Sequence, residues 1–164
     1  MTKQFNRLTD DKNKKSAVWH EFKIVEQYPL HKIKAIMARR EKLKTAISSL
    51  LQIFCKKIYN PYTKHLKLFF SLDWKSQFEE ISFGHDIEGA WLMNEASMLI
   101  NNGALDKEVH LITKQLVLST LNEGLDKDGS LFNEIKGSQL DTDKHWWPQA
   151  EAMVGFLDAY ELEG

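Results

Sequence analysis

Apolar side chains recur at helical spacing along this chain after residue 40, and Gly, Asn and Pro interrupt them at intervals. The first run predicts an amphipathic helix over about residues 41–59, because its apolar residues share one helix face. Asn60-Pro61 is a stop signal for it. Similar runs predict helices over about residues 86–102 and 106–122, and a last helix from about Pro148 to Tyr160. The residues of the first run are Leu43, Ile47, Leu50, Leu51, Phe54 and Ile58.

Short stretches between these helices have the features of β-hairpins. Residues 66–70 alternate with the two-residue period of a strand, and residues 79–83 are a plausible return strand after a polar turn. Asp128-Gly129, followed by residues 130–135, predicts a second hairpin, and residues 137–144 indicate a polar loop. The order is helix, hairpin, helix, helix, hairpin, helix. It favours an all-α fold with small β-hairpins, of the α/α toroid kind, over a sealed bundle.

Composition fits one soluble globular domain, because 43% of the 164 residues are hydrophobic and 27% are charged. No apolar stretch approaches the roughly 20 residues that span a bilayer, and the first residues lack the apolar core of a signal peptide. We therefore expect no membrane partner. Cys55 is the only cysteine, which excludes an internal disulfide and fits the reducing cytoplasm.

Charge is unevenly distributed although the formal net charge is −1. Residues 1–40 hold ten Lys and Arg against four Asp and Glu, whereas residues 41–164 hold twelve against nineteen. A basic leader could contact nucleic acid, but no nucleic-acid motif accompanies it. We expect residues 1–40 to be a solvated basic lead-in, no nucleic-acid partner, and residues 41–164 to form the folded domain.

The segment ISFGHDIEGAWL (81–92) places His85 at the start of the second predicted helix. Glu88 and Trp91 follow three and six residues later, so the three side chains can share one helix face. A histidine can accept a proton near neutral pH, a carboxylate can orient it or bind a hydroxyl, and an indole offers a flat apolar wall. Such a group suits acid–base chemistry on a sugar.

The segment KHWWPQAEAMVGFLDAY (144–160) carries a second group of this kind at the start of the last helix. Trp147 and Glu151 are four residues apart and stack on one helix face. Trp146 and Trp147 are adjacent and cannot both point into the core, so we expect one to face a cavity while the other packs. Gln149 lies between them and Glu151.

Less specific interpretations stay open for both segments. His85 could be a helix-start residue, Glu88 a favourable first-turn charge and Trp91 a core residue. A metal site is a further alternative, because His and Glu three residues apart can share a metal ion, but no third ligand of matching spacing is evident. Surface or capping positions are expected for the other histidines with no comparable setting: His20, His31, His65 and His110.

Three segments resemble the sugar 2-epimerases of the N-acylglucosamine 2-epimerase and cellobiose 2-epimerase superfamily. They are KIYNPYTKHLKLFF (57–70), SFGHDIEGAWLMNEA (82–96) and KHWWPQAEAMVGFLDAY (144–160). The GHDIE form is similar to that of the cellobiose branch. The resemblance implies part of an (α/α)6 barrel with its active site in the central cavity. Because only four of the twelve helices of such a barrel are evident, the chain resembles a partial, truncated member, and residues 1–40 do not match the family.

The resemblance also implies a reaction. Members of this family invert C2 of an open-chain sugar: a base removes the C2 proton, a cis-enediol forms, and a proton returns to the opposite face. Two histidines do this, without an organic cofactor or a metal in the cellobiose branch. By resemblance, His85 is one of them, and the second is expected beyond Gly164. The resemblance further implies that two carboxylates, Glu88 and Glu151, bind and polarise the sugar. It implies that the tryptophans Trp91, Trp147 and Trp146 hold the sugar rings.

The leading prediction is therefore a sugar 2-epimerase fragment acting on a reducing disaccharide or monosaccharide such as cellobiose. An aldose–ketose isomerase of the same superfamily passes through the same enediol. A glycoside hydrolase would need Glu88 and Glu151 about 5–10 Å apart across a glycosidic bond. A catalytically inactive remnant would bind sugar without turnover. A partial barrel would leave inner helix faces exposed, so we also expect self-association.

Overall fold

The computed structural model describes residues 30–163. It divides into two units, Met1–Leu43 and Lys44–Gly164, and residues 30–43 are the described part of the first. These residues begin helix α3, Leu30–Ile53. The predicted start of this helix at residue 41 is therefore wrong. Ile36 and Met37 are largely exposed, so intrinsic helix propensity forms this part of α3, without a buried stripe that apolar spacing would detect.

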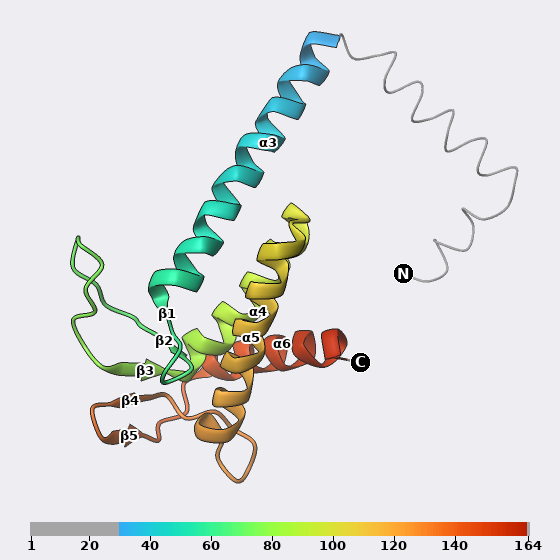
Figure 1. Ribbon diagram of the computed structural model, residues 1–164. Helices are drawn as coiled ribbons and strands as arrows, with labels where there is room; N and C mark the ends of the chain where they lie inside the picture. The colour runs from blue at the N-terminus through green and yellow to red at the C-terminus, as the bar shows by residue number, and fades with distance from the viewer. Residues whose placement is uncertain (1–29, 164) are drawn as a thin grey trace, which may run out of the picture. The chain divides into compact units, whose positions relative to one another are not determined.

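In the second unit, α3 continues into a π-helical turn, and small strands alternate with three further helices (Figure 1). The elements after α3 are η2 (Phe54–Ile58), β1 (Tyr59–Asn60), β2 (His65–Leu66), β3 (Glu80–Ser82), α4 (Phe83–Ile100), α5 (Gly103–Ser119), η3 (Thr120–Gly124), β4 (Glu134–Lys136), β5 (Gln139–Asp141) and α6 (Trp146–Glu163).

Helix α4 is the centre of this unit, because it packs against both α5 and α6. Phe83 and Ile87 on α4 are fully buried, as are Val109 and Leu116 on α5 and Leu131 in the loop before β4. A helix covered on several sides needs apolar or small residues on most of its faces. The sequence FGHDIEGAWLMNEASMLI meets that need with alanines and glycines between its larger apolar residues.

The described helices of this unit confirm the predicted α-helical runs with shifted ends. Helix α4 ends before Asn101, which has left-handed backbone geometry at φ 53°, and the Asn102 side chain caps α5 by accepting a bond from the Leu105 amide. Gly124 ends the following π-helical turn, η3. Helix α6 begins at Trp146, two residues before Pro148, which still lies in the first turn, where no helix partner is needed for its missing N–H.

The predicted pairing of residues 66–70 with 79–83 is wrong. Strand β2 pairs with β1 instead, with Leu66 opposite Tyr59, and an isolated bridge joins Phe70 to Ser76. The strand signal was misleading because consecutive residues His65 and Leu66 are both buried, and the strand ends after Leu66. Alternation in the sequence therefore did not correspond to two faces of one sheet.

The second hairpin is also displaced from its predicted place. Strands β4 and β5 pair around Gly137, which has φ +60°, and so the predicted polar loop 137–144 contains β5. Asp128-Gly129 forms a separate turn closed by a bridge between Leu125 and Leu131. Both glycines have positive φ, where glycine is favoured, but Gly137 is the one at the hairpin turn. Strand β3 joins the edge of β4 and completes a three-stranded sheet.

Cys55 lies in η2 and is buried in the core. Burial and the nearby negative charge of Glu108 raise the pKa of its thiol to about 11. The thiol is thus a protonated core group at neutral pH. Among residues 30–163, no helix combines the length and the apolar character that crossing a membrane requires.

Candidate functional site

The first turn of α4 presents His85 at the surface of the second unit. Ser82 occupies the N-cap position, but its side chain makes no capping bond to the helix. Its Oγ lies 2.8 Å from Nδ1 of His85 instead. The Ser82 side chain thus contacts the imidazole of His85 rather than a backbone amide of α4. The other ring nitrogen of His85, Nε2, lies on the side of the ring away from that contact.

Trp147 on α6 forms the wall beside His85. The two ring centroids are 5.0 Å apart in an edge-to-face arrangement. This approach requires Gly84, since a Cβ added there would lie 2.6 Å from Cη2 of Trp147 and 3.1 Å from Cβ of Pro148. The glycine before the histidine is therefore needed for close contact between the starts of α4 and α6.

A second contact joins the same two helices further along. Nε1 of Trp91 donates a hydrogen bond to Oε2 of Glu151 over 2.8 Å, and both side chains are half-buried. Trp91 thus holds the Glu151 carboxylate in one orientation. Glu88, also half-buried, lies one helical turn after His85.

The structure thus brings the predicted site residues together in two pairs, His85 with Trp147 and Trp91 with Glu151. Trp146 is 82% exposed, so of the two adjacent tryptophans Trp147 packs and Trp146 faces outward. The roles in sugar binding and catalysis assigned to these residues stay predictions.

Gln149, which we grouped with the site, has a structural contact. Its Oε1 accepts a bond from the Leu131 amide at 2.7 Å, and its Nε2 donates one to the Leu131 carbonyl at 2.8 Å. The side chain therefore pairs with the backbone of the loop before β4 as a strand would. These two hydrogen bonds fix the start of α6 relative to the three-stranded sheet.

The expectation that His65 is a surface or capping residue is wrong. Its side chain is 2% exposed and lies between two carboxylates: Nδ1 is 2.7 Å from Oδ2 of Asp86, and Nε2 is 3.3 Å from Oε2 of Glu123. Asp86 is itself 1% exposed, and its Oδ1 accepts a 2.7 Å bond from the Leu66 amide. The sequence segment that contains His85 thus also contains a buried acid that the spacing analysis passed over.

The electrostatics of this pair follow from its partners. Burial alone would lower the pKa of His65, but the hydrogen bonds and charges of Asp86 and Glu123 outweigh burial and raise it above 6.5. Burial also raises the pKa of the Asp86 carboxyl, which His65 and the Leu66 amide oppose. The raised pKa of His65 favours a charged pair, whereas the raised pKa of Asp86 favours a neutral carboxyl in the same contact. The geometry favours the ion pair, because carboxylate oxygens face both ring nitrogens and an amide faces the second oxygen of Asp86.

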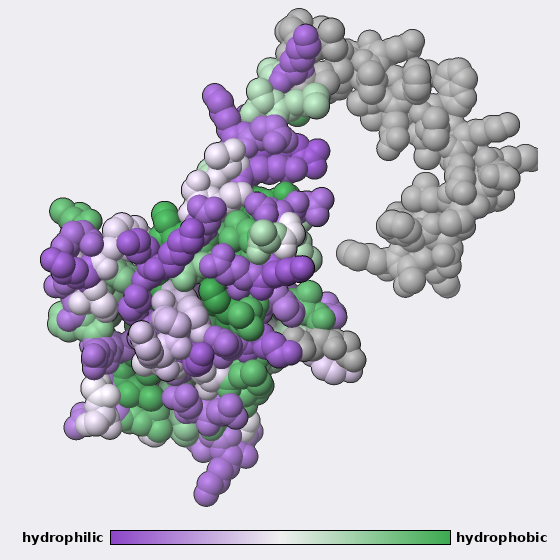
Figure 2. Space-filling model, in the orientation of Figure 1, coloured by the Kyte–Doolittle hydropathy of each residue, from purple (hydrophilic) through white to green (hydrophobic). Residues whose placement is uncertain are grey.

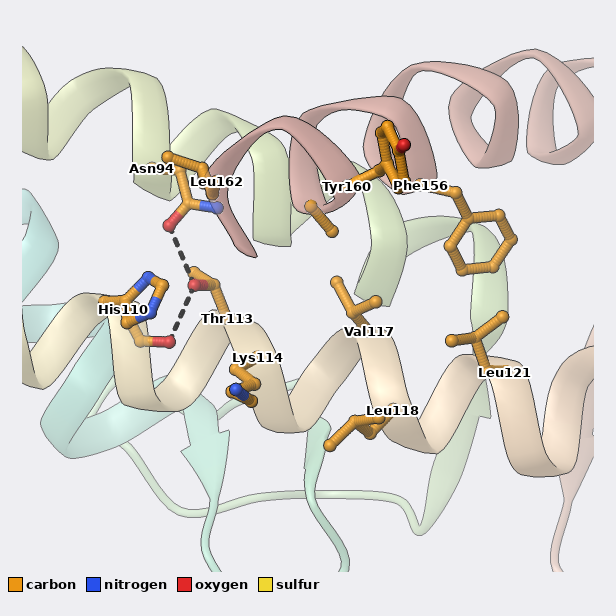
Figure 3. Close-up of a pocket in the computed structure, with 11 residues that line it drawn as sticks. Asn94, His110, Thr113, Lys114, Val117, Leu118, Leu121, Phe156, Tyr160 and Leu162 are labelled. Atoms are coloured by element: carbon orange, nitrogen blue, oxygen red, sulfur yellow. Dashed lines mark hydrogen bonds between the residues drawn. The ribbon is translucent and has the colours of Figure 1, made fainter. Parts of the chain in front are cut away.

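Two clefts of the second unit are lined by residues other than His85. One of about 320 Å³ opens between α5 and α6 and is mostly apolar (Figure 3). Inside it, Oγ1 of Thr113 donates to Oδ1 of Asn94 over 2.7 Å. Another cleft, of about 380 Å³, is lined by Trp91 and by the acidic residues Glu95, Asp158 and Glu161. In the described part of the chain, no group of three His, Cys, Asp or Glu side chains is placed to hold a metal ion.

Comparisons with known proteins place these features in a family. A family of unknown function (DUF6641) matches residues 1–71. Cellobiose 2-epimerase of Bacteroides fragilis is 31% identical over 173 aligned residues, which cover 100% of this chain and 43% of that protein. Cellobiose 2-epimerase of Dictyoglomus turgidum is 40% identical over 121 residues, which cover 74% of this chain and 31% of that protein.

Solved structures agree. Cellobiose 2-epimerase from Bacillus thermoamylovorans superposes with a TM-score of 0.71 at 36% identity, over 74% of this chain and 31% of that one. The enzyme from Spirochaeta thermophila gives a TM-score of 0.66 at 37% identity, over 74% and 30%. The present chain spans less than half the length of these relatives. Its described helices and small hairpins correspond to part of an (α/α)6 barrel, and the chain is a partial member of the superfamily that contains the cellobiose 2-epimerases.

Proposed function

We propose that this chain carries one side of a sugar 2-epimerase site, in which His85 exchanges the C2 proton of a reducing sugar such as cellobiose. The observation that supports it is the exposed His85 ring, held by Ser82 on one side and flanked by the Trp147 indole at 5.0 Å. A fixed imidazole beside an aromatic face suits a base that must reach the C2 proton of an open-chain sugar held against that face.

The proposed chemistry follows from the weak acidity of a proton next to an aldehyde. In the open-chain sugar, His85 takes the proton from C2, the C1–C2 bond becomes the double bond of a cis-enediolate, and negative charge develops on O1. Return of a proton to C2 regenerates the aldehyde. Glu88 and Glu151 would bind the sugar hydroxyls, and Trp91, Trp147 and the exposed Trp146 would contact its rings. The bond from Trp91 to Glu151 supports this assignment because it fixes an acceptor near an aromatic surface.

Inversion requires a second base on the opposite face of C2. By resemblance we expect that histidine beyond Gly164, and the chain spans only 31–43% of the length of the curated relatives compared above. One base suffices for proton exchange with retention at C2, whereas two are needed for an epimer. The proposal therefore assigns C2 proton exchange to the groups of this chain and epimerisation to the site once both bases are present.

The test is proton NMR of cellobiose, and separately of glucosyl-mannose, incubated with the pure chain in D2O. Because the face that His85 addresses sets which C2 configuration it deprotonates, exchange at C2 of one of the two sugars without an epimer is the expected result. His85→Gln, which retains a hydrogen-bonding group, should abolish exchange. Absence of exchange from both sugars in a folded chain contradicts the proposed chemistry.

Other products of the same incubation identify the competing activities. A ketose would show that the proton returns to C1, as in an aldose–ketose isomerase. Release of monosaccharides would indicate hydrolysis through Glu88 and Glu151. Sugar-dependent shifts of the tryptophan indole signals without any exchange would indicate binding by an inactive remnant. The first two outcomes would replace the proposed activity by another reaction class, and the third would replace it by binding alone.

We also propose that the chain self-associates and acts in the cytoplasm. Exposed apolar side chains lie on α5 and α6, with Leu118 47%, Met153 76% and Leu157 57% exposed. Apolar patches between polar residues are also visible in Figure 2. Surfaces of this kind favour burial against another copy. The single, buried Cys55 suits a reducing compartment. The division at residue 40 stays a prediction.

A further inference from the structure

We propose that the buried contact between His65 and Asp86 positions His85. Through this contact, β2 would fix the orientation of the first turn of α4, which carries His85. The inference rests on the proposed function in treating His85 as the reacting group. It adds two residues that do not reach the sugar. Three independent contacts join β2 to α4, all within the second unit.

The first link is the Asp86 carboxylate, which has both oxygens occupied by β2. Oδ1 accepts from the Leu66 amide and Oδ2 faces Nδ1 of His65, each at 2.7 Å. A buried carboxylate is costly unless its oxygens are satisfied. Any rotation of the first turn of α4 would break at least one of these bonds. Asp86 therefore resists such rotation, and its chain neighbour is His85.

The second and third links are packing contacts. The His65 ring meets the ring of Phe83, the first residue of α4, edge to face at 6.1 Å. One turn later, Leu66 packs on Gly89, where an added Cβ would lie 2.7 Å from Cδ1 of Leu66. The polar bond at Asp86 is thus flanked on both sides by close apolar contacts, which fix the height of β2 along the helix as well as its rotation.

His85 depends on this fixed turn for both of its neighbours. Its ring must stay 2.8 Å from Ser82 Oγ and 5.0 Å from the centre of the Trp147 ring. The first neighbour is the N-cap residue just before this turn, and the second is on α6. A small twist of the turn carries the imidazole away from Trp147 even if the bond to Ser82 survives. His65 and Asp86 are accordingly positioning residues, whose hydrogen bonds act on His85 through the backbone of α4.

The experiment compares Asp86→Asn with two matched controls in the full chain. Asn keeps an oxygen for the Leu66 amide but loses the charge that faces His65. Glu123→Gln alters the other carboxylate on His65, which is half exposed and lies on η3. Thr113→Val removes a buried hydrogen bond from α5 to α4 that lies away from the first turn.

The main readout is the ring nitrogen spectrum of His85, recorded by long-range proton–nitrogen NMR without sugar. The unchanged chain, Glu123→Gln and Thr113→Val should show one ring tautomer, held by the contact with Ser82. Asp86→Asn should instead show a mixture of the two His85 ring tautomers. The indole response to added cellobiose should require about tenfold more sugar in Asp86→Asn, the effect of losing one positioned hydrogen bond.

An unchanged His85 ring spectrum in Asp86→Asn, with stability lowered as in Thr113→Val, would overturn the proposal and leave the pair a purely structural one. Should Asp86→Asn fail to fold, His65→Gln decides on the same readout, because its amide can still donate to Asp86 and so retains the fold. A native chain that gives no indole response to cellobiose would count against the proposed function. The ring comparison does not depend on sugar and would still decide the positioning role.

Discussion

Gly84→Ala tests the contact on which the candidate site depends, because it places one methyl group between the starts of α4 and α6. The new Cβ would lie 2.6 Å and 3.0 Å from two atoms of the Trp147 ring and 3.1 Å from Cβ of Pro148. Ordinary contacts of this kind begin at 3.4 Å. The indole must therefore withdraw by about 0.8 Å, and Pro148, being part of the helix, cannot move aside alone.

The magnitude follows from two opposing contributions. Overpacking of a fitted contact costs about 1–3 kcal/mol. Replacing Gly by Ala in a helix returns about 0.4–1 kcal/mol by restricting the unfolded chain. We expect Gly84→Ala to lower the free energy of unfolding by about 0–2.5 kcal/mol. Gly103→Ala is the matched control, since no atom lies within 4 Å of its added Cβ, and it should be neutral or slightly stabilising.

The difference between the two variants isolates the overlap at Trp147. It should amount to about 1–3 kcal/mol in urea unfolding, or about 2–4 °C of melting temperature per kcal/mol for a chain of this size. Near-ultraviolet circular dichroism should change only in Gly84→Ala, because the indole moves away from His85. Equal stability of the two variants with identical aromatic spectra would refute the tight packing of α6 on Gly84.

Three further predictions concern other contacts of the second unit. Because Asp86 and Glu123 raise the folded-state pKa of His65 above its ordinary value of 6.5, the stability from its proton is full below pH 6.5 and is lost as pH rises through the folded pKa. The urea midpoint should therefore fall as pH rises above 6.5, and His65→Gln should flatten this dependence. Trp91→Phe removes the donor to Glu151 and should cost about 1 kcal/mol in urea unfolding, whereas the exposed Trp146→Phe should cost less than about 0.5 kcal/mol; equal costs would contradict the role of the bond. Leu157→Lys should shift sedimentation towards the monomer without changing the melting temperature by more than a few degrees, and a monomeric unchanged chain would exclude self-association.

Helix positions could be predicted because their cause is local. The apolar spacing and the Asn102-Gly103 and Gly124 breaks place α4 and α5 to within a few residues. The start of α4 was set three residues late, since Phe83 and Gly84 join the helix through packing against other elements. Trp147 and Glu151 were also predicted on one helix face, because they lie four residues apart.

The strand partners and the buried histidine could not be predicted in this way. The environment of His65 is made by Asp86, 21 residues away, and by Glu123, 58 residues away. The segment around His65, YNPYTKHLKL, has polar residues next to the histidine, which indicates an exposed position. Likewise β3 has its partner in β4, far along the chain, while the nearest alternating segment pairs elsewhere. Long-range pairing leaves no periodic trace in either partner.

The buried Cys55 gives the chain a practical property. A thiol whose pKa is about 11 presents a thiolate in only about one molecule in 10³–10⁴ at neutral pH, and its burial keeps reagents away. Maleimide and nitroxide reagents will therefore leave the native cysteine unmodified. A single Tyr62→Cys substitution, at a position 93% exposed in the turn between β1 and β2, then accepts one probe at one known place. Movement of the β1–β2 hairpin relative to α4 can be followed by fluorescence or spin resonance without removing any native residue of the core.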